Sequence, residues 1–117
     1  MQGKFISLLK KNITMSVLVN FAIFPTDKGS SVSEYVSNVI KTIQDSGVDY
    51  KLTSMATIIE TDTMAQALEI IQKAYGILEP DCERVYCVAT FDIKKGNKGR
   101  MSEKIKSIVN KIGEVSE

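Results

Sequence analysis

The residues with the clearest capacity for chemistry lie in the stretch TSMATIIET, at positions 53–61. Ser54, Thr57 and Glu60 place two hydroxyls and one carboxylate in a segment that is otherwise small or apolar. Such groups bond polar ligands with defined direction. Two interpretations are open: the three side chains line a small polar pocket, or they face solvent at the edge of a strand.

Two further polar residues are candidates for a ligand site: Asn20 in an apolar segment and Ser31 at the start of a helix. Asn20 interrupts an apolar segment, and a buried amide needs a partner. That partner is an oligomer contact, Thr90 across the sheet, or a ligand. Ser31 has a sufficient task as a helix cap, although the free N–H groups of a helix start leave a ligand role open.

The loop KKGNKGR, at positions 94–100, is basic and contains two glycines. It lacks the G-x-x-x-x-G-K-[ST] pattern of a phosphate loop. A solvated turn and a phosphate contact are therefore both open interpretations. The candidate phosphate ligands are Lys94, Lys95, Lys98 and Arg100.

Catalytic and metal-binding patterns are not evident in the sequence. The chain has no histidine, and its two cysteines lack zinc-type spacing. Asp92 and Glu60 can meet on neighbouring strands, but a carboxylate pair for acid–base catalysis needs separated pKa values, and nothing in the spacing requires contact. No nucleophile stands beside an evident base. We therefore predict a non-catalytic protein with no metal and no cofactor.

Composition narrows the class of protein further. With 117 residues and 44% apolar content, the chain is long enough for one domain with its own core. A net charge of +1 gives no field to attract nucleic acid or a membrane surface. No apolar run approaches the roughly 20 residues that span a bilayer.

The cysteines, Cys82 and Cys87, are five positions apart, and an odd spacing places them on opposite faces of an extended strand. We therefore predict no disulfide between them and interpret both as small buried hydrophobic residues. Free thiols suit a reducing compartment, so a cytoplasmic location is predicted.

Hydrophobic periodicity and turn residues predict four strands and three helices. The strand at 16–24 is apolar on both faces, so both faces are predicted to be buried. A capping-box pattern at Ser31 and Glu34 opens the first helix. The predicted strands are 16–24, 49–55, 56–60 and 84–93, and the predicted helices run from Ser31 to Gly47, from Thr61 or Asp62 to Pro80, and onward from about Ser102.

This order is β-α-β-β-α-β plus a C-terminal helix. It is the α+β, ferredoxin-like sandwich: a four-stranded antiparallel sheet with two helices on one face. The uncovered face would carry Leu18, Ala22 and Phe24 as an apolar patch, which predicts a homo-oligomer, dimer or tetramer, through sheet faces. Residues 15–117 are predicted to be a single domain, and residues 1–14 a dispensable N-terminal extension.

Three stretches in this order resemble a family of small proteins described as thiamine-binding-like, long uncharacterised and related to the YkoF-type binders of thiamine and hydroxymethylpyrimidine. The resemblance covers about residues 15–115. Ala56 stands where the family usually has glycine or a polar residue, Thr61 where it usually has a second glycine, and Lys94 where it often has arginine. The three stretches are VNFAIFPTDKGSSVSEYV, ATIIET and FDIKKGNKGRMSEKI.

The resemblance implies a non-catalytic, oligomeric protein that binds thiamine or a related aminopyrimidine. It implies Glu60 as the main hydrogen-bond acceptor, with Thr57, Ser54 and Asn20 orienting the ring. A carboxylate would also favour the thiazolium cation of thiamine. Ser31 and Lys94 complete the predicted site. The alternative is an interaction or regulatory domain that contacts another protein through its sheet face and basic loop.

Overall fold

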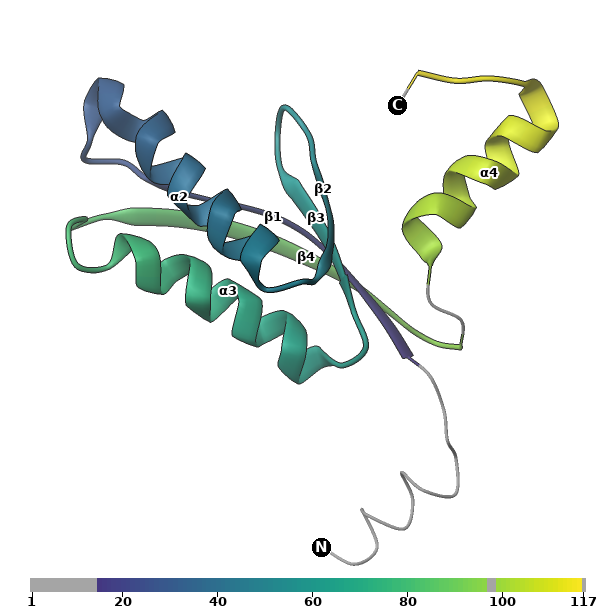
Figure 1. Cartoon of the computed structure of the whole chain (residues 1–117), viewed down its shortest axis with the longest axis horizontal. Helices are drawn as coiled ribbons and strands as arrows, with labels where there is room; N and C mark the ends of the chain where they lie inside the picture. The colour runs from purple at the N-terminus through teal and green to yellow at the C-terminus, as the bar shows by residue number, and fades with distance from the viewer. Residues whose placement is uncertain (1–14, 97–98, 117) are drawn as a thin grey trace, which may run out of the picture.

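The structure is a computed structural model that describes residues 15–96 and 99–116. The order of strands and helices confirms the predicted ferredoxin-like α+β fold with a C-terminal helix (Figure 1). The predicted extension, residues 1–14, lies outside the described residues. The elements are β1 (Met15–Pro25), the short 3-10 helix η1 (Gly29–Ser31), α2 (Val32–Asp45), β2 (Asp49–Leu52), β3 (Thr57–Thr61), α3 (Met64–Leu78), β4 (Val85–Lys95) and α4 (Arg100–Ile112).

The four strands form one sheet in the order β2-β3-β1-β4, and every neighbouring pair is antiparallel. β1 is central and pairs with β4 along its whole length, from Met15↔Lys95 to Pro25↔Val85. β2 and β4 are the two edge strands. The sheet is thus organised around β1. One face of β1 contributes to the core, and the other lies on the opposite side of the sheet.

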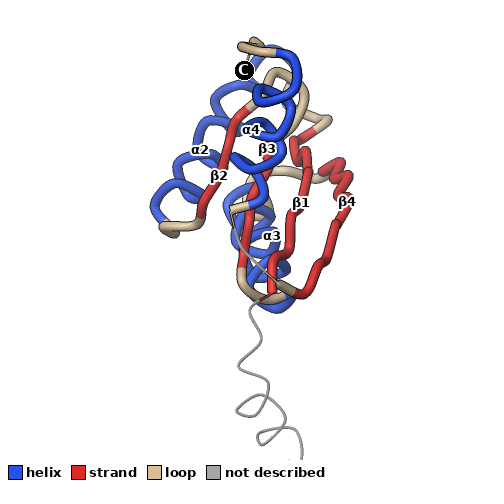
Figure 2. The backbone as a smooth tube through the Cα atoms, turned by 90° about the vertical axis from the view of Figure 1, so that its right-hand side faces the viewer, coloured by secondary structure: helices blue, strands red, loops and turns tan. Residues whose placement is uncertain are grey.

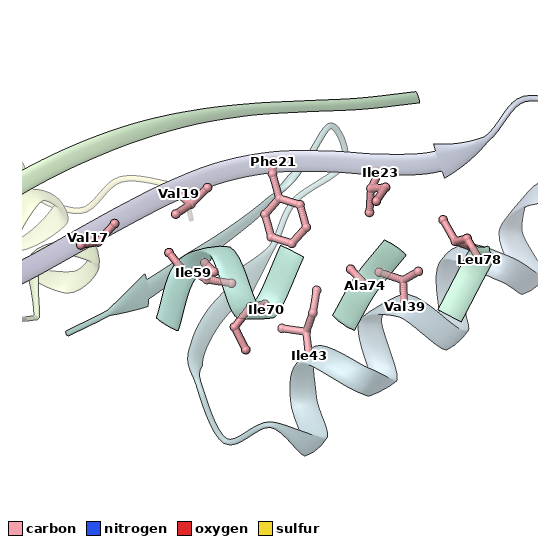
Figure 3. Close-up of a cluster of buried hydrophobic side chains, with 11 residues drawn as sticks. Val17, Val19, Phe21, Ile23, Val39, Ile43, Ile59, Ile70, Ala74 and Leu78 are labelled. Atoms are coloured by element: carbon pink, nitrogen blue, oxygen red, sulfur yellow. The ribbon is translucent and has the colours of Figure 1, made fainter. Parts of the chain in front are cut away.

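One face of the sheet is covered by α2 and α3, which lie together on that side (Figure 1). Every second residue of β1 points into the core between these helices and the sheet (Figure 3). Burying a side chain of this size stabilises the fold by about 1.5–3 kcal/mol. The core residues are Val17, Val19, Phe21, Ile23, Val39, Ile43, Ile59, Ala67, Ile70, Ala74 and Leu78.

The other side, which we call the open face, carries the alternate residues of β1. Leu18, Ala22 and Phe24 are half-buried there, and Asn20 is exposed. The prediction that both faces of β1 are buried is therefore wrong for the open face within one chain. Its covering element is α4, which stands apart from α2 and α3 in Figure 1, although it overlaps α2 in the view of Figure 2.

The β2–β3 connection is a tight turn that contains Met55. β2 ends at Leu52, earlier than expected, because Thr53 closes the turn. Its backbone N–H donates to the Ala56 carbonyl at 2.9 Å, and its hydroxyl accepts from the Ala56 N–H at 3.1 Å. These bonds set where β3 begins, at Thr57.

The helix starts differ from the predictions in detail. Thr63, and not Thr61 or Asp62, caps α3 in a capping box with Gln66. Ser31 stands before α2, but its side chain makes no capping bond, because it already belongs to the turn of η1. The predicted capping box with Glu34 is therefore wrong. α4 begins at Arg100, two residues before the predicted Ser102.

Both cysteines are free, as predicted, but only Cys82 is even half-buried. Cys87 is exposed, so the prediction that both thiols are buried is wrong for this residue. The reason is its place on β4, an edge strand on which only Val85, Ala89 and Phe91 are half-buried. In the part of the chain that the structure describes, no helix has the length and apolar character needed to cross a membrane.

Candidate functional site

The largest group of predicted site residues lies at a cavity between α2 and the β2–β3 turn, which we call the α2 cavity. Its volume is about 380 Å³. Three hydroxyl-bearing residues, Thr53, Ser54 and Thr57, interrupt a largely apolar wall. The apolar residues include Phe21, Phe24, Val32, Val36, Ile40 and Leu52.

Thr57 has a free hydroxyl on the wall of the α2 cavity. The residue is 5% exposed, and its hydroxyl has no hydrogen-bond partner among residues 15–96 and 99–116. In that part of the chain every fully buried side-chain nitrogen or oxygen is bonded, so this hydroxyl must reach the cavity. It can donate one hydrogen bond and accept two.

Ser54 reaches the same cavity from the turn and is exposed. The hydroxyl of Thr53 is already used, because it donates to the Ala56 carbonyl at 2.7 Å. The turn is therefore held by Thr53, while Ser54 and Thr57 present their hydroxyls to the cavity. The structure brings these two predicted residues together.

Asn20 lies elsewhere, in a groove between the open face and α4 that we call the α4 groove. This groove has a volume of about 710 Å³ and mostly apolar walls, among them Leu18, Ile58, Ile105 and Val115. Thr90 contacts only the backbone carbonyl of Asn20, at 3.4 Å. The side-chain amide has no partner among the described residues. Because Asn20 is exposed, the prediction of a buried amide is wrong within one chain, and an oligomer contact or a ligand at this position stays a prediction.

Glu60 is 3% exposed and belongs to neither the α2 cavity nor the α4 groove. Its Oε2 accepts from the Ser16 hydroxyl at 2.5 Å, from the Gly99 N–H at 2.9 Å and from the Arg100 N–H at 3.3 Å. Burial by itself raises the pKa of Glu60, but these hydrogen bonds outweigh it and hold the pKa below its ordinary value.

Arg100, one of the four candidate phosphate ligands in the basic loop, completes the same cluster. It is 7% exposed, and its guanidinium donates to Ser16 Oγ at 2.8 Å, to the Ser16 carbonyl at 2.8 Å and to Asp92 Oδ2 at 2.9 Å. A further bond reaches the Asp92 carbonyl at 2.6 Å. The guanidinium is thus occupied inside the protein.

Asp92 and Glu60 stand on one face, but not on neighbouring strands as the sequence had suggested, because β1 lies between β3 and β4. Both are cross-strand partners of Leu18, one on each side of β1, so they share the open face without touching each other. Arg100 lies between them and bonds to both residues. The geometry is that of an internal bridge and not of two carboxylates converging on a substrate.

Glu60 also borders a polar hollow of about 330 Å³ where α2 ends and α3 begins. Asp49, Asp62 and Glu69 line this hollow together with Lys73. Among the described residues, no group of three or more acidic, histidine or cysteine side chains is arranged to hold a metal ion.

Ser31 and Lys94 are both exposed and line neither the α2 cavity nor the α4 groove. Ser31 lies at the end of η1, next to Val32 of the α2 cavity. Lys94 pairs in the sheet with Ser16, at the opposite end of β1. The six predicted residues are therefore distributed over several places in one chain.

A four-stranded antiparallel sheet with two helices on one face and an apolar cavity at its edge defines a small ferredoxin-like α+β protein. The chain belongs to the thiamine-binding protein family, whose sequence profile matches residues 19–109. This confirms the resemblance in the sequence.

Relatives of known sequence and structure agree with this assignment. The chain is 33% identical over 94 residues to UPF0045 protein Mb1933 of Mycobacterium bovis, covering 80% of this chain and 92% of that protein. The crystal structure of protein MJ1052 from Methanocaldococcus jannaschii matches 80% of this chain and 95% of its own, with 26% identity and a TM-score of 0.70. A Thermotoga maritima structure, TM0486, shares the fold at 20% identity and a TM-score of 0.61, over 80% of this chain and 98% of that one.

Proposed function

We propose that this protein binds thiamine or a related aminopyrimidine in the α2 cavity, without chemical conversion of the ligand. The observation that carries the proposal is the Thr57 hydroxyl, which is nearly buried, faces the cavity and has no partner among the described residues. Buried polar groups are normally hydrogen-bonded, so a ligand is a natural partner for it. Family membership and the name of the Thermotoga maritima protein, which places that protein provisionally in thiamine biosynthesis or salvage, support the ligand class.

The chemistry of the cavity suits a small flat heterocycle. Its volume of about 380 Å³ falls within the range of small-molecule sites. Apolar walls such as Val36 and Ile40 would bury the faces of a pyrimidine ring. Thr57 and Ser54 would bond to its nitrogens and exocyclic amine, since hydroxyls both donate and accept.

This proposal transfers the main ligand contact from Glu60 to Thr57. Glu60 already accepts three hydrogen bonds inside the chain, and these give it a structural task. Direct ligand contacts by Asn20, Ser31 and Lys94 remain predictions.

A homo-oligomer is part of the proposal, and the uncovered part of the open face supports it. Tyr86 and Val88 of β4 are about half exposed there, beside Phe24, whose ring lies 5.6 Å from that of Tyr86. A second copy would bury this patch. Light scattering at micromolar concentration should show a dimer or tetramer, and a stable monomer would contradict this part of the proposal. Co-purification of a defined heterologous protein would instead favour the interaction-domain alternative.

The ligand proposal is tested by calorimetric titration of the full chain with thiamine and with hydroxymethylpyrimidine. Thr57→Val removes the hydroxyl and keeps the shape of the side chain. We expect micromolar or tighter binding that this variant weakens at least about tenfold, or ~1.4 kcal/mol.

Thr90→Val is the matched control, because it makes the same change at the α4 groove. It should leave the affinity within about twofold. A loss in Thr90→Val without a loss in Thr57→Val would move the ligand to the α4 groove. The absence of binding heat with either compound would contradict the ligand class.

A further inference from the structure

The attachment of α4 to the rest of the molecule is uneven along the helix. Its first residue, Arg100, is buried against β1 and β4, whereas Ile108 is 49% exposed and Ile112 is 73% exposed. Apolar burial therefore contributes little at the distal end of α4. The helix is held at its start.

The contacts at that start are polar and come from three strands, and we call this group of residues the α4 latch. Ser16 from β1, Glu60 from β3 and Asp92 from β4 all bond to Gly99 or Arg100 at distances of 2.6–3.3 Å. Lys104, one turn further along, adds a 3.5 Å ion pair to Asp92.

Glu60 also replaces a missing helix cap. The residue before α4 is Gly99, with a φ of 85° and no side chain to cap the helix. The Glu60 carboxylate instead accepts the N–H groups of Gly99 and Arg100. A negative charge at this end also interacts favourably with the helix dipole. Residues distant in sequence thus supply what α4 lacks locally.

We infer that the α4 latch is a conformational switch: it holds α4 over the open face, and its release lets α4 move away as a unit while the βαββαβ sandwich stays folded. Release would uncover the floor of the α4 groove, including Leu18 and Ile58. Glu60 is then a positioning residue for α4. The inference is independent of the proposed ligand, which lies at the α2 cavity.

The physical basis is the difference between the contacts that α3 and α4 would lose on moving away from the sheet. Moving α3 would expose Ala67, Ile70, Ala74 and Leu78, which are buried in the core. Moving α4 would break a compact set of hydrogen bonds, and the apolar residues that it would uncover, such as Leu18 and Ile58, are only half-buried. In α4 itself the single fully buried residue is Arg100. Segments with few buried apolar contacts are those that open locally below the global unfolding free energy.

The test is native-state hydrogen exchange of the full chain, read by mass spectrometry on peptides from α4 and α3. Ser16→Ala is the decisive variant, because Ser16 is fully buried and cannot touch a ligand. We expect exchange in α4 to accelerate about tenfold or more while α3 exchange is unchanged. Glu60→Gln, which keeps the shape and removes the charge, should act in the same direction.

Ser37→Ala is the matched control, since Ser37 is exposed on α2 and bonds only to the Ser33 carbonyl within its own helix. It should change neither helix. Three results would overturn the inference: unchanged α4 exchange in both latch variants, equal acceleration of α4 and α3, or a wild-type α4 without protection. If a variant fails to fold, the protection of α4 and α3 in the wild-type chain still tests the inference.

Discussion

The two faces of the sheet are held by different forces. On one face, α2 and α3 bury a continuous apolar core against Val17, Val19, Phe21 and Ile23. On the open face, α4 is tied down by a polar cluster at one end and leaves a groove along the rest. Hydrophobic burial adds up over area and has no direction, whereas a polar cluster acts at one place and depends on geometry. The face under α2 and α3 therefore supplies most of the stability of the fold, whereas the open face carries the helix that we infer to move.

The α2 cavity and the α4 groove differ in the same way as the two faces of the sheet. The α2 cavity is bounded by core elements and a turn locked by Thr53, so its shape is set before a ligand arrives. The α4 groove depends on where α4 sits. A preformed site loses less free energy to ordering on binding, which favours the α2 cavity for a small ligand.

The largest expected effect is on the core. Phe21→Ala removes a ring that is 2% exposed and should lower the free energy of unfolding by about 3–5 kcal/mol. Urea denaturation measures this loss. Phe24→Ala, on the open face of the same strand, is the control and should cost clearly less. Equal losses would contradict the contrast between the two faces.

Next comes the α4 latch. Arg100→Ala leaves the buried Ser16 carbonyl without its partner and should cost about 1–3 kcal/mol, measured by urea denaturation. Lys104→Ala removes only an exposed ion pair to the same Asp92, so a loss below about 1 kcal/mol is expected. A loss for Arg100→Ala as large as that for Phe21→Ala would show that α4 belongs to the core unit.

A smaller effect separates the two helices of the covered face. Thr63→Ala breaks the capping box of α3 and should lower stability by about 1 kcal/mol in thermal or urea unfolding. Ser31→Ala removes a hydroxyl that makes no capping bond in α2, so little change is expected. A larger loss at Ser31 than at Thr63 would mean that Ser31 has a contact beyond its own chain.

The smallest expected effect is the pH dependence of α4 docking. Glu60 has its pKa held below the ordinary 4.5, so its charged form stabilises the docked α4 above that pH, and this stabilisation is lost as the pH falls through the folded pKa. The charged groups around it are Arg100 from α4, Asp49 from β2 and Asp92 from β4. NMR of the Gly99 amide should show a transition below pH 4.5 that Glu60→Gln abolishes. A transition that persists in Glu60→Gln would contradict the assignment of this pH dependence to Glu60.

The separation of Thr57 from Glu60 could have been recognised in the sequence. They are three residues apart on one strand, and an odd separation places side chains on opposite faces. Thr57 accordingly faces α2, while Glu60 faces α4. The role of Arg100 had no comparable local signal, because its partners Ser16 and Glu60 are 84 and 40 residues away.

Local order was determined by the sequence itself. Alternation along β1, the apolar stripes of the helices and the glycine and proline breaks specify the element order, because periods of two and of 3.6 residues are intrinsic to strands and helices. Only the tertiary structure decided which polar groups meet. Glu60 became the cap of α4, and Thr57 was left with a free hydroxyl, because strand register and helix docking bring together residues that no local pattern links.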